Sequence, residues 1–149
     1  MLHKGDTAPG FELPDQNGNL VKLGELLDAG PLVLYFYPAD FTPVCTREAC
    51  AFRDRHEDLR NLDVAIVGIS PQNQASHQRF AETYGLPFPL LCDPDKKVIR
   101  AYGVDGPLGL GVRRVTYLIE PDGKISNRAV SDIFLGSHLA LIEEVLGRP

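Results

Sequence analysis

The chain is poor in cysteine and has no long apolar run. It contains three cysteines among 149 residues. That number is odd and too small for a secreted disulfide framework, so we expect a transient or catalytic use of the thiols. No stretch approaches the roughly 18 apolar residues of a membrane span. The first residues, 1–6, lack the apolar core of a signal peptide, so we expect a cytoplasmic protein.

An excess of positive charge is also missing. The 15 basic and 20 acidic residues give a net charge of -5, which excludes an electrostatic footprint for nucleic acid or an anionic membrane. No Cys-x-x-Cys occurs, and the histidines show no paired metal spacing. The glycines of 103–111 match neither a dinucleotide fingerprint nor a phosphate loop. We therefore expect no metal, no cofactor, no nucleic-acid partner and no membrane partner.

The remaining pattern alternates between strands and helices, with glycine and proline at most junctions. We expect strands at 31–37, 64–69 and 89–91, helices at 42–59, 73–84 and 137–147, a helical turn at 97–102 and a loop at 103–111. Residues 11–13 and 20–23 read as extended, and 115–119 and 124–127 as a late β-hairpin. This order predicts an α/β fold in one domain, residues 1–149. A central mixed β-sheet is flanked by helices and preceded by an N-terminal extended or hairpin extension.

Cys45 stands where a buried strand passes into a helix. Residues 31–37 form an almost unbroken apolar run of strand-forming residues, and a helix begins after them. At a helix N-terminus the unpaired backbone N–H groups and the positive end of the macrodipole favour a thiolate, which is the nucleophilic form of cysteine. Cys45 is therefore predicted to be reactive.

Cys50 lies on the same predicted helix, five residues after Cys45. Helical spacing places Cys45 on an inner face with positions 41, 49, 52, 56 and 59, whereas Cys50 falls about 140° around the axis, toward the polar side. An inert buried thiol is the alternative for Cys50. The two Cα atoms of an intact helix would be about 8.6 Å apart, beyond the roughly 7 Å limit for a disulfide. A Cys45–Cys50 bond therefore requires the first turns of the helix to unwind, and Pro43 restricts where the chain bends.

The segment Pro38-x-x-x-Thr42-x-x-Cys45 resembles the peroxidatic-cysteine signature of the peroxiredoxins. With Cys50 five residues later, it is similar to the subgroup called bacterioferritin comigratory protein or peroxiredoxin Q. The resemblance extends over 5–11, 84–91 and 114–119. It implies a thioredoxin-like fold and thiol-dependent reduction of hydrogen peroxide and alkyl hydroperoxides. It also implies a thioredoxin or glutaredoxin-type reductant, no cofactor, and a monomer, with a weak dimer as the alternative.

The same resemblance assigns roles to individual residues. It makes Cys45 the peroxidatic residue and Cys50 the resolving residue, which condenses with a sulfenic acid on Cys45 to give a disulfide. By this resemblance, the peroxide would be bound by Thr42, by the backbone N–H groups of Val44 and Cys45, and by Arg114. Pro38 would shield the site. Val44 stands where the subgroup commonly has glycine, and the loop between Tyr102 and Arg114 is shorter than in many members.

Several of these residues have structural alternatives. Thr42 is placed to cap the helix, and we expect capping and substrate binding to coexist. Arg114 could be a solvated charge at a strand end; Arg113 would face the opposite way, and the family register selects Arg114. Glu48, one turn after Cys45, could orient an arginine or be a solvated helix charge.

Two other functions are compatible with a reactive Cys45. A cysteine hydrolase would need a histidine, such as His138, to activate the thiol, and would leave Cys50 and Arg114 unexplained. A redox sensor would form the disulfide once, as a signal, without turnover. Cys92 follows an apolar run and is predicted to be a buried structural thiol, with an alternative resolving role as its rival.

Overall fold

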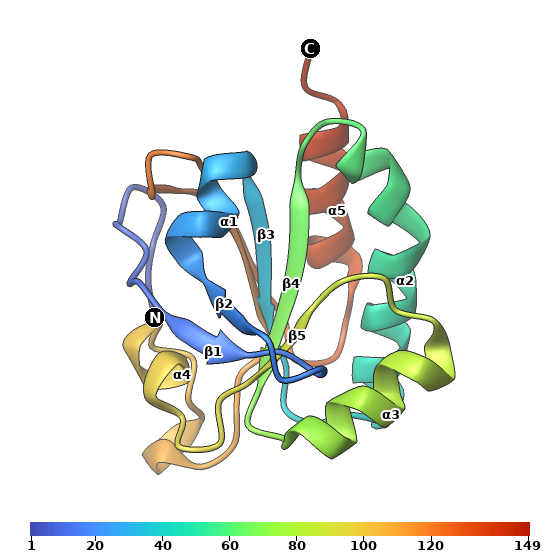
Figure 1. Ribbon diagram of the computed structural model, residues 1–149. Coiled ribbons are helices and arrows are strands. Elements are labelled where there is room, and N and C mark those ends of the chain that lie inside the picture. The colour runs from blue at the N-terminus through green and yellow to red at the C-terminus, as the bar shows by residue number, and fades with distance from the viewer.

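The computed structural model describes residues 1–149 as a five-stranded sheet between two layers of helices (Figure 1). The strands are β1 (Glu12–Pro14), β2 (Leu20–Lys22), β3 (Leu32–Phe36), β4 (Ala65–Ser70), β5 (Leu90–Cys92), β6 (Val115–Ile119) and β7 (Ile125–Val130). The helices are α1 (Leu23–Ala29), α2 (Pro43–Arg60), α3 (Gln74–Tyr84), α4 (Lys97–Ala101) and α5 (Gly136–Leu146), with a 3-10 turn, η1 (Pro107–Gly109). No helix is both long and apolar enough to cross a membrane.

The sheet has the strand order β5-β4-β3-β6-β7. The first three strands are parallel, whereas β6 runs antiparallel to β3 and pairs with β7 as a hairpin. β1 and β2 form a separate antiparallel pair. The mixed sheet, the late hairpin and the N-terminal hairpin extension are thus confirmed. Because β6 is antiparallel to β3, the residues before β6 lie beside those that follow β3, with Val115 opposite Phe36.

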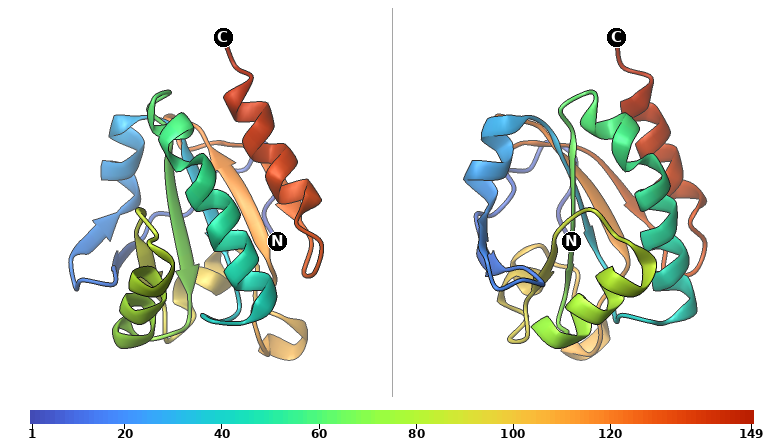
Figure 2. Two further views of the ribbon diagram at one scale, coloured as in Figure 1. Left: turned by 90° about the vertical axis from the view of Figure 1, so that its right-hand side faces the viewer. Right: turned by 45° about the vertical axis from the view of Figure 1, so that its right-hand side comes forward.

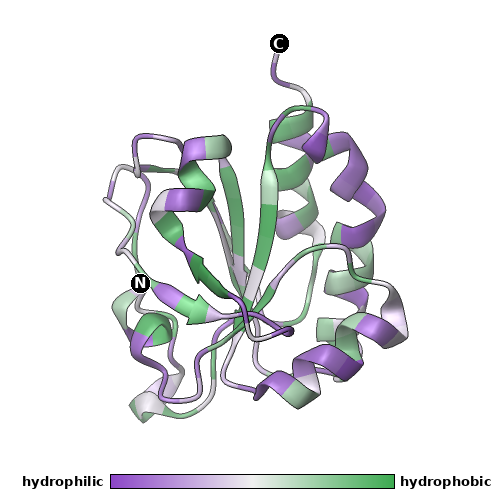
Figure 3. Cartoon of the chain, viewed as in Figure 1, coloured by the Kyte–Doolittle hydropathy of each residue, from purple (hydrophilic) through white to green (hydrophobic).

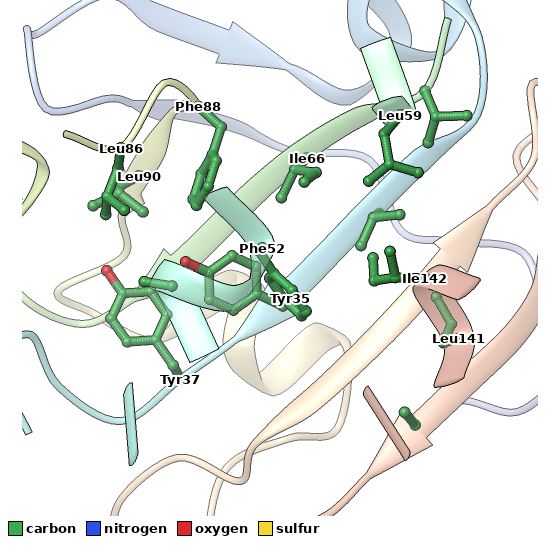
Figure 4. Close-up of a cluster of buried hydrophobic side chains, with 14 of the residues drawn as sticks. Tyr35, Tyr37, Phe52, Leu59, Ile66, Leu86, Phe88, Leu90, Leu141 and Ile142 are labelled. Atoms are coloured by element: carbon green, nitrogen blue, oxygen red, sulfur yellow. The ribbon is translucent and has the colours of Figure 1, made fainter. Parts of the chain in front are cut away.

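The side chains of β3 alternate between two apolar cores, as the period of two in a strand requires. Val33, Tyr35 and Tyr37 belong to the core under α2, α3 and α5, which Figure 4 shows around Phe52. The alternate residues Leu32, Leu34 and Phe36 belong to the opposite core, under α1 and α4. Both faces of β3 are therefore buried. Figure 3 shows that the central strands are made of hydrophobic residues, as such burial requires.

Helix α2 begins at Pro43 and carries both cysteines of interest. Pro43 fits the first helical turn, where its missing N–H is not needed. Cys45, Ala49, Phe52 and Leu59 are buried as predicted, whereas His56 is only half-buried and Glu48, which was not placed on this face, is buried as well. Phe41 does not belong to this buried face. It precedes the helix in a left-handed conformation (φ 65°) and is 45% exposed, with its ring against Phe80 at the edge of that core.

The first helix was not expected from the sequence. Residues 20–23 were predicted to be extended, but the strand ends at Lys22 and α1 follows at once. This helix has only seven residues, contains Gly24 and lacks a side-chain cap, so it has few of the usual helix signals. Leu23 and Leu27, one turn apart, are buried against the sheet, and this packing stabilises the helix.

Candidate active site

Cys45 lies at the third position of α2, at the edge of the sheet where β3 ends. Its residue is 1% exposed and its thiol is free. The first intrahelical bond runs from Thr46 N–H to the Thr42 carbonyl, so the N–H groups of Val44 and Cys45 precede the ladder and have no hydrogen-bond partner. Two backbone donors and the positive end of an 18-residue helix are thus collected around the sulfur.

Arg114 reaches the sulfur from the strand edge beside β3. One guanidinium nitrogen donates to Cys45 Sγ at 3.1 Å, another donates to Glu48 Oε1 at 2.8 Å, and Nε donates to the Asp132 carbonyl at 3.2 Å. The residue is 3% exposed, so the alternative of a solvated charge is wrong. Arg113 points outward and pairs with Asp132. The chain therefore directs one of two neighbouring arginines at Cys45.

Glu48 is completely buried beside Arg114, so the alternative of a solvated helix charge is also wrong. Burial raises the pKa of this carboxyl to about 7, although Arg114 acts in the opposite direction. For Arg114, burial alone would lower the pKa, but the neighbouring Glu48 and Cys45 raise it above the ordinary value. The guanidinium is therefore a permanent cation held between two acidic groups.

Thr42 occupies the cap position of α2 but does not cap it with its side chain. Its hydroxyl donates instead to the Ala39 carbonyl at 3.1 Å. The expectation that Thr42 also caps the helix through its side chain is thus wrong. Because the hydroxyl hydrogen is used, the oxygen has lone pairs left to accept a hydrogen bond from another group. Pro38 and Val44, half-buried, flank this segment.

The loop that carries Pro38 and Thr42 is held by a buried polar network that the sequence did not reveal. Asp40 accepts from the hydroxyls of Tyr37 and Ser76, each at 2.7 Å, and lies 2.7 Å from His77 Nδ1. His77 Nε2 donates to the Leu91 carbonyl at 3.0 Å, which ties the loop to α3 and β5. In the sequence, Asp40 looks like an ordinary loop residue. The one sequence signal for this network is His77, a polar residue on the buried face of a helix, which needs a hydrogen-bond partner.

A comparison with known proteins decides the family. Residues 4–128 match the AhpC/TSA family. The chain belongs to that family. Peroxiredoxin Bcp of Bacillus subtilis is 42% identical over 127 residues, covering 81% of this chain and 80% of the relative. The chloroplastic Peroxiredoxin Q of Triticum aestivum is 40% identical over 149 residues, covering 97% and 68%.

Solved structures give the same result for this member of the AhpC/TSA family. Peroxidoxin BcpB from Mycobacterium tuberculosis superposes with a TM-score of 0.92 at 38% identity, over 100% of both chains. Peroxiredoxin Q from Xanthomonas campestris gives 0.83 at 29% identity, over 91% of this chain and 89% of the other. The predicted thioredoxin-like peroxiredoxin fold is confirmed, and the chain is an oxidoreductase of the thiol peroxidase family.

The two other cysteines of this AhpC/TSA family member differ in their surroundings. Cys50 is half-buried on the unbroken α2, and its thiol is free. Cys92, at the end of β5, is buried, and burial together with Asp40 and Asp15 raises its pKa to about 11. Cys92 is therefore a protonated thiol at neutral pH, which makes it a poor nucleophile.

A hydrolase would need a base hydrogen-bonded to the nucleophile, and no base makes such a bond to Cys45. His138, the histidine considered for this role, contacts Thr116 Oγ1 at 2.7 Å and the Ser131 carbonyl at 3.0 Å. The side chain within hydrogen-bonding distance of the Cys45 sulfur is that of Arg114. A guanidinium stabilises an anion but cannot accept a proton, so this arrangement suits a thiolate that is already formed.

Proposed function

We propose that this thiol peroxidase reduces hydrogen peroxide and alkyl hydroperoxides through a sulfenic acid on Cys45 and a disulfide between Cys45 and Cys50. The observation that carries the proposal is the 3.1 Å contact between the Arg114 guanidinium and the Cys45 sulfur, with two unpaired N–H groups alongside. These donors stabilise negative charge at the sulfur and at the oxygens that react with it.

In the first step the Cys45 thiolate attacks one oxygen of the peroxide. The S–O bond forms as the O–O bond breaks, sulfur is oxidised to sulfenic acid, and the leaving oxygen takes a proton to become water or an alcohol. Thr42 supports this step by accepting a hydrogen bond from the hydroperoxide O–H, because its own hydrogen is directed to Ala39. Arg114 and the N–H groups of Val44 and Cys45 donate to the oxygen on which charge develops. Pro38 shields the reacting atoms from water.

In the second step the Cys50 thiol attacks the sulfenic acid and releases water. The product is the Cys45–Cys50 disulfide, which protects Cys45 from further oxidation. Both residues lie on one continuous helix, so the first turns of α2 must unwind before the sulfur atoms can meet. The high pKa of Cys92 disfavours its use in place of Cys50.

In the third step an external dithiol, thioredoxin or a glutaredoxin-type protein, reduces the disulfide by exchange and is itself oxidised. This cycle requires a reducing compartment, for which the cytoplasm is the candidate that three unpaired cysteines favour. A single chain supplies every group named above, so we propose that a monomer is sufficient for activity.

The test is peptide mass spectrometry after one equivalent of hydrogen peroxide is added to the reduced protein. We expect a rapid loss of two hydrogens that maps to Cys45 and Cys50. Cys45→Ser should abolish the reaction. Cys50→Ser should allow one round of peroxide reduction but block cycling with thioredoxin, and Cys92→Ser is the matched control that should cycle normally. Reaction no faster than that of an ordinary thiol would refute the peroxidase, whereas fast oxidation without turnover would indicate a redox sensor.

A further inference from the structure

One oxygen of the Glu48 carboxylate takes no part in the contact with Arg114. Arg114 binds Oε1, but Oε2 is fully buried and has no hydrogen-bond partner. The ring of His138 on α5 lies beside this oxygen, with Nδ1 3.7 Å from Oε2 and both side chains completely buried. A buried carboxylate oxygen without a donor is costly, so a proton placed between these two groups would remove the cost.

The hydrogen bonds of His138 show where such a proton can reside. Nε2 lies 3.0 Å from the Ser131 carbonyl, which only accepts, so Nε2 carries a hydrogen. Nδ1 lies 2.7 Å from the Thr116 hydroxyl, which can donate to it or accept from it. Nδ1 is therefore the nitrogen free to be protonated or not, and it is also the nitrogen that faces Glu48.

The charges around this pair give the proton a consequence for Cys45. Arg114 is the one buried arginine or lysine, and it contacts two acidic groups, the carboxylate of Glu48 and the thiol of Cys45. Tyr35 on β3 is neutral, because burial and the nearby Glu48 raise its pKa well above the ordinary value. Asp132, in the loop before α5, is half exposed; its carboxylate accepts from the Arg113 side chain and the Arg114 backbone N–H, and its charge acts to raise the pKa of His138. A thiolate beside an ionised Glu48 would thus leave one uncompensated buried negative charge.

We propose that Glu48 and His138 hold one proton between them while Cys45 is a thiolate, and that His138 is thereby a positioning residue that sets the pH at which the thiolate forms. With that proton in place, the charges of Arg114 and Cys45 balance. The raised pKa of Glu48 and the burial-lowered pKa of His138 bring the two groups close together in proton affinity, as a shared proton requires. The inference builds on the proposed function, because it concerns the nucleophile of that reaction.

The experiment titrates the thiolate by its absorbance at 240 nm, in a Cys50→Ser/Cys92→Ser background where Cys45 is the one thiol. This readout needs no peroxide, so it is independent of whether the peroxidase cycle is correct. His138→Gln keeps an amide that can donate to Ser131 but cannot titrate. We expect it to move the midpoint of the Cys45 titration about one pH unit higher, because Glu48 then loses its proton earlier. An unchanged or lower midpoint would overturn the proposal.

A second pair of variants separates this role from a merely structural one. In a Glu48→Gln background no proton can be shared, so His138→Gln should leave the midpoint where Glu48→Gln alone puts it. An equal shift in both backgrounds would overturn the proposal. His56→Gln is the matched control, since His56 lies on the same helix but forms no hydrogen bond or ion pair with Glu48 or Arg114, and we expect it to leave the midpoint unchanged.

Discussion

Arg114 links the two acidic groups of the site, the Cys45 thiol and the Glu48 carboxyl, because it donates a hydrogen bond to each. It donates to Cys45 and Glu48 with different nitrogens of one rigid, planar guanidinium, and its Nε–H donates to the backbone carbonyl of Asp132. A lysine could supply the positive charge, but its single ammonium group could not present separate donors in one plane to both partners. The geometry therefore requires an arginine, while its neighbour Arg113 serves only an exposed ion pair with Asp132.

Replacing Arg114 by Gln should lower kcat/KM for hydrogen peroxide by about 100-fold or more, because a donor to the reacting charge is lost. It should also reduce stability by about 1–3 kcal/mol, because the buried Glu48 carboxyl loses its hydrogen-bond donor. Arg114→Lys should recover part of the stability and little of the activity. Arg113→Gln, the matched control, should change both by little, and a comparable loss of activity there would show that general charge, not the contact with Cys45, is responsible.

Glu48 should make the stability of the protein fall as the pH rises. Its pKa is raised to about 7 in the folded state from 4.5, so the folded protein binds more protons than the unfolded chain between these values. The favourable contribution is complete below pH 4.5 and is lost as the pH rises through 7. Between about pH 5.5 and 8 the loss is about 2 kcal/mol.

Urea unfolding at several pH values measures this effect, with Glu48→Gln as the comparison. The stability difference between the wild-type protein and the variant should shrink as the pH increases from about 5.5 to 8, because the amide does not titrate. A difference that stays constant over this range would mean that Glu48 has an ordinary pKa despite its burial.

At the scale of the elements, local sequence patterns were sufficient for most of the fold. The apolar run at 31–37, the two strand-forming runs of the late hairpin and Gly85 at the end of α3 all marked elements that the structure contains. Figure 2 shows α2, α3 and α5 on one face of the sheet, an arrangement that the sequence pattern did not specify beyond a sheet flanked by helices. The short helix α1 was missed because tertiary packing of Leu23 and Leu27, not local propensity, stabilises it.

The site was predictable where a residue belongs to a recognisable motif and not where burial decides its role. Cys45 and Arg114 could be singled out in advance. Glu48 could not be distinguished from a surface charge, because its burial depends on α5 and on the residues before β6. Asp40 and His77 are 37 positions apart and meet only when the loop after β3 packs against α3.

Oxidation should unfold the start of α2. The ladder of this helix is continuous from Pro43 to Arg60 in the reduced protein, and a Cys45–Cys50 disulfide cannot form within it. Amide hydrogen exchange over residues 43–52 should therefore become faster by at least about tenfold when the disulfide forms, while α5 keeps its protection. Peroxide-treated Cys50→Ser controls for oxidation of Cys45 alone and should show little change. Equal protection in reduced and disulfide forms would contradict the need for unwinding.

At the scale of the whole molecule, the catalytic edge is supported by the tightly filled core beneath α2. Tyr35 crosses this core with its ring edge toward Phe52, 4.9 Å between centroids, and it fits only because β4 has a glycine at position 68. A Cβ at Gly68 would lie 2.8 Å from Tyr35 Cζ, closer than real Cβ contacts. The ring is enclosed by β3, β4 and α2, so it cannot move aside without displacing the helix that carries Cys45.

Gly68→Ala should therefore destabilise the protein by about 1–3 kcal/mol through overpacking, measured as a lower urea midpoint with an unchanged slope. The same substitution at Gly24 is the matched control, because no atom lies within 4 Å of the added methyl group and the residue is helical. Gly24→Ala should stabilise by about 0.5–1 kcal/mol, since alanine has the higher helix propensity and restricts the unfolded chain. If both variants unfolded at the wild-type midpoint, the core under α2 would have to be loose enough to accept a methyl group. Packing of that core could then not be what fixes the position of the helix that carries Cys45.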